Sequence, residues 1–263
     1  MRRAPSRFWL WTLPLALGIA GALVLTVGFL LALRGSVGEP IGEPPPAPRR
    51  ITPARGRSGP FRLLVVGDSL ARGTGDETGR GFAVDVLDAL RKKGPAELTN
   101  LGVNGMESPE VLSLVASANV QALVSSADLI LLSAGANDLS HAVAGSSSAA
   151  DLASSVSLAR ARYAQNLREI LRKLRQANPR APIGVLGLYD PFEIEAARAR
   201  LGAEVILQWN VLLAETALGF PNVFVVPTFD LFQARPDRLS PDRYHPNADG
   251  YARIAERILQ VAR

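Results

Sequence analysis

Short apolar segments alternate with longer amphipathic segments from residue 61 to the end of the chain. Most of the short segments are rich in valine, isoleucine and leucine and lack polar alternation, which is typical of strands buried on both faces of a parallel sheet. They predict strands over Arg62–Val66, Glu97–Leu101, Leu129–Ser133, Ile183–Leu188 and Val223–Val226. Apolar residues spaced three and four apart predict helices over Phe82–Lys93, Pro109–Ser125, Leu152–Ala177, Glu195–Leu218 and Ala248–Ala262. This alternation predicts an α/β fold with a doubly wound, five-stranded parallel sheet.

The N-terminus carries a segment that predicts a membrane anchor. Phe8 to Leu33 is 26 residues without a charged side chain, and roughly 20 apolar residues in a helix cross a bilayer. Three arginines precede this segment and only Arg34 follows it closely, which predicts a cytoplasmic N-terminus and an extracytoplasmic body. The alternative is a cleaved signal peptide, whose apolar region usually spans only about 7–15 residues. We therefore expect a single-pass protein of the cell membrane.

Composition shifts along the chain predict its domains. Residues 35–60 contain seven prolines and are expected to form an extended tether. Residues 1–34 then form the cytoplasmic stub and the anchor, and residues 61–263 form the globular domain. Residues 1–60 carry a net charge of +6 and the rest −1, so the basic pI does not indicate a nucleic-acid partner. No cysteine and only two histidines are present, and we expect neither metal nor cofactor.

Four polar segments are predicted to meet at the carboxyl edge of this sheet, where parallel α/β folds place their chemistry. Gly67-Asp68-Ser69-Leu70 ends the first strand, and Asn100 to Gly105 follows the second. Gly135 to Asp138 follows the third strand, and Asp242 to Pro246 precedes the last helix. Together these segments contain every residue type that acyl transfer to a serine requires.

The chemistry predicted for this edge is that of a serine nucleophile. Asp242 and His245 are three residues apart, so the carboxylate can orient the ring, and the ring can then deprotonate Ser69. The Ser69 and Gly102 backbone N–H groups and the Asn137 side-chain amide are the expected oxyanion donors. Each residue alone also has a common structural role, as a helix cap or a turn residue. The combination of all four segments favours catalysis.

Other polar residues near these segments are expected to be structural. Asp68 and Asp138 are predicted to hold loop geometry. His141 is expected to be a solvated loop residue rather than a second base.

The four blocks, in this order, resemble those of the GDSL/SGNH hydrolase family. The extended Gly67–Asp76 stretch and the segment Leu188-Tyr189-Asp190-Pro191-Phe192 resemble its exported, lysophospholipase-like lipase/acylhydrolases from Gram-positive bacteria. The resemblance spans residues 67 to 246. It implies a flavodoxin-like three-layer α/β/α sandwich and a cofactor-free serine ester hydrolase. By the same resemblance Ser69, Asp242 and His245 form the catalytic triad, and Ser69, Gly102 and Asn137 form the oxyanion hole.

The substrate stays open between several hypotheses. A lysophospholipid or another lipid ester agrees with the family and the predicted membrane location. An O-acetyl group on a cell-wall glycan is the nearest alternative. Acyl transfer instead of hydrolysis, and a non-catalytic binding module of the envelope, are further alternatives. Phe192, Ile194 and Trp209 lie in segments that could shape an acyl pocket, although such residues are more often core.

Overall fold

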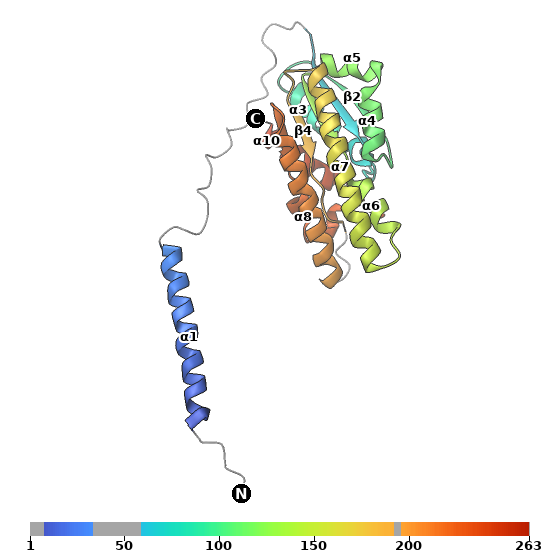
Figure 1. Ribbon diagram of the computed structural model, residues 1–263. Helices are drawn as coiled ribbons and strands as arrows, with labels where there is room; N and C mark the ends of the chain where they lie inside the picture. Colours follow the sequence, from blue (N-terminus) through green and yellow to red (C-terminus); the bar gives the residue numbers. More distant parts are fainter. Residues whose placement is uncertain (1–7, 34–58, 192–195, 263) are drawn as a thin grey trace. The chain divides into compact units, whose positions relative to one another are not determined.

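The computed structural model describes residues 8–33, 59–191 and 196–262, apart from the side chains of 8–17, 31–33 and 196–201 (Figure 1). The chain divides into two units, Met1–Ala47 and Pro48–Arg263, which we describe separately. Most of the predicted tether at 35–60 lies outside the described residues, as do Phe192 and Ile194.

The first unit contains the helix α1, Phe8–Leu33. Its bounds are those of the uncharged segment in the sequence. Among the residues that the structure describes, however, we find no helix with the length and apolar character needed to cross a membrane. The predicted transmembrane helix is therefore not supported by the structure.

The second unit is built on a five-stranded parallel sheet. Its strands are β1 Phe61–Gly67, β2 Ala96–Gly102, β3 Leu129–Ser133, β4 Ile183–Leu186 and β5 Val223–Val226, in the order β2-β1-β3-β4-β5. This order is that of flavodoxin-like sheets, so the predicted fold class is confirmed. Strand β4 ends two residues before the predicted Leu188. The side-chain amide of Asn210 bonds both the N–H and the carbonyl of Leu188 there, at 2.7 and 2.8 Å.

Helices cover both faces of the sheet (Figure 1). One face packs against α4 Ser108–Ala116, α5 Ala118–Ser126, α7 Ala149–Ala177 and α8 Ala196–Leu218. The opposite face packs against α3 Gly81–Arg91 and α10 Ala248–Val261. Four short elements were not predicted: α2 Ser69–Arg72, α6 Ala136–Ala144, α9 Phe229–Phe232 and the 3₁₀ helix Pro236–Arg238.

The two hydrophobic layers follow from strand geometry. Successive side chains of a strand point to opposite faces, so Leu64 and Val66 enter one layer, while Leu63 and Val65 enter the other. In the α7–α8 layer, the rings of Tyr163 and Trp209 stack with centroids 5.2 Å apart. Trp209 is fully buried in this core.

The end of β1 is pressed against the end of β3. Gly67 is paired in register with Ser133 and has a φ of +144°, a conformation that side chains other than hydrogen rarely allow. A Cβ on Gly67 would lie 2.0 Å from the Ser133 carbonyl oxygen. Only glycine therefore lets the chain turn here towards Ser69.

We expect Gly67→Ala to lower the free energy of unfolding by about 3 kcal/mol, since it combines backbone strain with a backbone clash. Urea unfolding of the full-length protein measures this loss. Gly79→Ala is the matched control, because Gly79 also has a positive φ, +70°, but no atom lies within 4 Å of its Cβ position. The control should lose only about 1 kcal/mol, and equal losses in the two variants would contradict the explanation.

Candidate active site

Ser69 is the first residue of α2, at the sharp turn that follows β1. Asp68 caps this helix, because its Oδ1 accepts a hydrogen bond from the Leu70 N–H at 3.0 Å. Ser69 is largely buried. The turn therefore presents its hydroxyl group from the carboxyl end of a central strand.

A buried network under the nucleophile holds this turn in place. The Ser133 hydroxyl donates to Asp68 Oδ1 at 2.6 Å. Its oxygen also lies 3.3 Å from the Asp68 N and 3.2 Å from the Ala71 N, both of which donate to it. Burial raises the pKa of Asp68, and the hydrogen bonds from Ser133 and Leu70 oppose that rise. Asp68 is thus structural, as predicted, whereas the part played by Ser133 was missed.

The three residues of the predicted triad are connected by hydrogen bonds. Ser69 Oγ lies 2.9 Å from His245 Nε2, and His245 Nδ1 lies 2.7 Å from Asp242 Oδ2. With the proton on Nδ1, the ring donates to the carboxylate, and Nε2 is free to accept the proton of the serine. This is the arrangement that activates a serine hydroxyl for attack.

Asp242 is held as a carboxylate by its surroundings. Partial burial by itself would raise the pKa of Asp242. Hydrogen bonds from the Ser240 hydroxyl, from His245 and from the Tyr244 N–H outweigh this effect and keep the pKa well below its usual range. The group is therefore charged at neutral pH and can stabilise an imidazolium ion.

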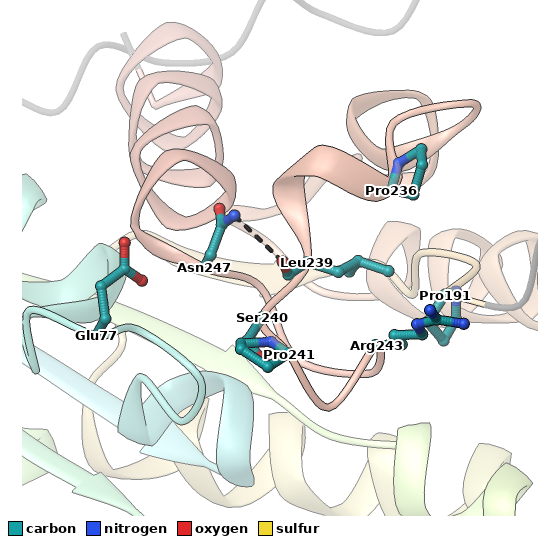
Figure 2. A pocket seen from close by; sticks show the side chains of 8 residues that line it. All are labelled: Glu77, Pro191, Pro236, Leu239, Ser240, Pro241, Arg243 and Asn247. Carbon is teal, nitrogen blue, oxygen red and sulfur yellow. Dashed lines mark hydrogen bonds between the residues drawn. The ribbon is translucent and has the colours of Figure 1, made fainter.

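The loop that carries Asp242 and His245 is closed at both ends by backbone contacts. Leu239 and Pro246 form an antiparallel bridge, and the Ser240 N–H donates to the His245 carbonyl at 2.8 Å. Asn247 caps α10 with its side-chain oxygen, and its amide group donates to the Leu239 carbonyl at 3.2 Å (Figure 2). The start of the last helix thus fixes the geometry of this catalytic loop, residues 239–247.

A cavity of about 910 Å³ borders the catalytic loop (Figure 2). It is lined by Ser240 and Arg243 of this loop and by Glu77 and Pro191. The carboxylate of Glu77 accepts a hydrogen bond from the Ala248 N–H at 3.1 Å, at the start of α10. Glu77 therefore helps to hold the last helix.

Two of the three predicted oxyanion donors keep an N–H without a partner among the described residues, and their role stays a prediction. Within the described residues, no hydrogen bond occupies the Ser69 N–H. One N–H of the Asn137 amide donates to the Met106 carbonyl at 2.8 Å. This bond fixes the direction of the amide and leaves its second N–H for a ligand.

Gly102, the third predicted donor, is differently engaged. Its N–H donates to Asn100 Oδ1 at 2.9 Å, and the Asn100 amide donates to the Ala71 carbonyl at 2.8 Å. A Cβ on Gly102 would lie 2.3 Å from the Arg72 N. The structure thus explains this glycine by the close packing of α2 on β2, and its role as an oxyanion donor stays a prediction.

Asp138 and His141 lie next to Asn137 on α6 but have other partners. Both carboxylate oxygens of Asp138 accept from Ser108, from its N–H at 2.9 Å and its hydroxyl at 2.5 Å, and burial raises the pKa of Asp138. His141 is exposed, and its Nδ1 is hydrogen-bonded to Glu107. The structure places His141 on a helix rather than on the predicted loop.

An apolar cavity of about 620 Å³ opens beside Ser69 and His245. Its size is typical of small-molecule sites, which span roughly 300–1,000 Å³. Its apolar lining includes aliphatic side chains of α6, α7 and α8: Leu139, Val143, Leu152, Val156, Val205 and Ile206. Trp209 of α8, which the sequence suggested for such a pocket, is buried in the core and is not among the residues that line it.

The sequence of this domain is similar to those of known proteins. Residues 65–253 match the model of the GDSL-like Lipase/Acylhydrolase family. Over 205 residues, 76% of this chain and 80% of the relative, the sequence is 27% identical to the uncharacterized protein YpmR of Bacillus subtilis (strain 168).

Solved structures share the fold. The lipase Lip_vut3 from a goat rumen metagenome is similar with a TM-score of 0.70 at 24% identity, over 76% of this chain and 97% of that one. Axe2, an acetylxylan esterase from Geobacillus stearothermophilus, has a TM-score of 0.59 at 18% identity, over 77% and 94%. Because the family match extends over nearly the whole sheet and its active edge, the chain belongs to the GDSL-like lipase/acylhydrolase family and is a carboxylic ester hydrolase.

Proposed function

We propose that this protein hydrolyses esters with an apolar acyl chain longer than acetyl, through an acyl-enzyme on Ser69. The observation that carries the proposal is the continuous hydrogen-bonded chain from Asp242 through His245 to Ser69, which opens onto an apolar cavity. An acyl chain in that cavity would lose its contact with water, as apolar ligands do in such sites.

The proposed reaction has two steps. In the first, His245 Nε2 takes the proton of Ser69 Oγ, which attacks the ester carbonyl, and the same proton then passes to the departing alcohol. In the second, His245 takes a proton from water, the resulting hydroxide attacks the acyl-enzyme, and the proton returns to Ser69 as the carboxylic acid leaves. Asp242 remains a carboxylate throughout and stabilises the charged ring.

The negative oxygen of each tetrahedral intermediate needs hydrogen-bond donors. We assign the Ser69 N–H and the free N–H of Asn137 to this role. Gly102 can contribute only if its bond to Asn100 breaks. The Gly105 N–H is the better candidate in this loop: it has no partner within the described residues, its φ of +78° turns the chain, and its neighbour Met106 already bonds Asn137.

The cavity favours a lipid-type acyl group over the alternatives. Its lining is mostly aliphatic, and acetyl, with one carbon beyond the carbonyl, would leave it largely empty. The relatives include both a lipase and acetylxylan esterases by their names, so the family alone does not choose between these substrates.

We expect the full-length protein to hydrolyse p-nitrophenyl octanoate with a kcat/KM at least about tenfold above that for the acetate, since apolar contacts add about 0.8 kcal/mol per CH₂. Ser69→Ala should lower kcat about 1,000-fold or more. Ser113→Ala, which removes an exposed hydroxyl on α4, is the control and should keep full activity.

Each other outcome points to a different hypothesis. A preference for acetate would favour the O-acetylesterase. Equal activity of Ser69→Ala would remove this serine from the mechanism. If a fluorophosphonate probe failed to label the folded protein, a binding module would be favoured.

Asp242→Asn should lower kcat by about 100-fold or more, because an amide no longer fixes the productive ring tautomer. The depressed pKa of Asp242 also contributes stability that is present above the unfolded value, about 3.9, and lost as the pH falls through the folded value. The variant should therefore be most destabilised at pH 7 and less so at pH 3. Urea midpoints at the two pH values measure this, and an equal difference at both would contradict it.

We further propose that α1 anchors the protein in the cell membrane with the hydrolase on the extracytoplasmic side. The support is the uncharged 26-residue segment with arginines before it. Full-length protein should then stay in the membrane pellet after an alkaline carbonate wash. Leu23→Arg, which costs roughly 2.5–3.5 kcal/mol at a helix centre, should shift part of it to the supernatant. Release of a shortened wild-type protein into the medium would favour the cleaved signal instead.

A further inference from the structure

Tyr244 connects the catalytic loop to the wall of the apolar cavity. It directly precedes His245, and both residues line the cavity. The two rings meet edge to face, with centroids 5.0 Å apart and planes at 84°. The Tyr244 hydroxyl lies 2.9 Å from the hydroxyl of Ser140, which is on α6.

The backbone of Tyr244 is held independently of this contact. Its N–H donates to Asp242 Oδ1 at 2.8 Å, and its carbonyl accepts from the Tyr189 hydroxyl at 2.8 Å. Tyr189 follows β4 and packs on Phe232 with ring centroids 4.3 Å apart. If the hydroxyl contact to Ser140 were lost, these bonds would therefore still hold the catalytic loop in place.

The position of α6 depends more on the Ser140–Tyr244 contact than the position of the catalytic loop does. This helix is nine residues long and forms one wall of the cavity through Leu139, Ser140 and Val143. The bonds of Asp138 to Ser108 fix its first turn. Val143, near its other end, is half exposed although it lines the cavity. The Ser140–Tyr244 hydrogen bond thus connects the middle of this wall to the catalytic loop.

We infer that the hydroxyl bridge between Ser140 and Tyr244 determines the acyl-chain specificity of the enzyme. The inference rests on the proposed function. By holding α6 against the catalytic loop, the bridge encloses an acyl chain that extends beyond its first carbons. An acetyl group ends beside Ser69 and gains nothing from the wall. The bridge therefore contributes to the binding of long acyl chains rather than to the chemical step.

Tyr244→Phe and Ser140→Ala test the inference, alone and combined, in the full-length protein. Steady-state kinetics with p-nitrophenyl octanoate and acetate give the ratio of their kcat/KM values. We expect each variant to lower the octanoate-to-acetate ratio about fivefold, the effect of one neutral hydrogen bond, with the loss in the KM for octanoate. The double variant should lose no more than either single variant, because both remove the same bond.

Tyr163→Phe is the matched control, since the Tyr163 hydroxyl is buried and has no partner within the described residues. Its ratio should equal that of the wild type. An unchanged ratio in Tyr244→Phe, an equal loss on both esters, or additive losses in the double variant would each overturn the inference, while octanoate hydrolysis that depends on Ser69 would leave the proposed function standing. A wild-type protein that cleaves neither ester would instead overturn both.

Discussion

The buried hydrogen bond from the Ser133 hydroxyl to the Asp68 carboxylate is the contact on which the active site depends. One serine at the end of β3 donates to this carboxylate and accepts from two N–H groups of the turn after β1. Such bonds are stronger in a buried environment than in water, and an unpaired partner would be costly there. The turn is consequently fixed to the end of the sheet rather than forming a surface loop, and the position of Ser69 is fixed with it.

The topology of the sheet explains why the functional groups meet. Strand β1 lies between β2 and β3. The chain therefore adds β2 on one side of β1 and then reverses to add β3 on the other side. The crevice at such a reversal is where open α/β sheets bind their ligands. Ser69 follows β1, Asn137 follows β3 and Tyr189 follows β4. The sheet thus brings the proposed nucleophile, a proposed oxyanion donor and a support for the loop 239–247 together from neighbouring strand ends.

The strands and the triad could be predicted because their signals are local. Continuous apolar runs matched β3 and β5 residue for residue, and the Asp242-x-x-His245 spacing predicted the contact between these two side chains. The predicted helix over 109–125 breaks instead at Ser117, whose extended backbone is marked by neither glycine nor proline. The role of Gly102 was equally hidden, since the capture of its N–H by Asn100 depends on how α2 packs against β2. Such details follow from tertiary contacts, which a single sequence does not display.

Ser69 and His245 are separated by 176 positions in the chain, and the loop that carries the histidine is clamped by the first turn of α10. That helix packs against α3, near the start of the domain, in one of the two hydrophobic layers. The catalytic hydrogen bonds therefore cannot form until the C-terminal helix has been made and has packed. An ester hydrolase built in this way is active only when the domain has folded, so its activity reports that distant parts of the chain have packed together.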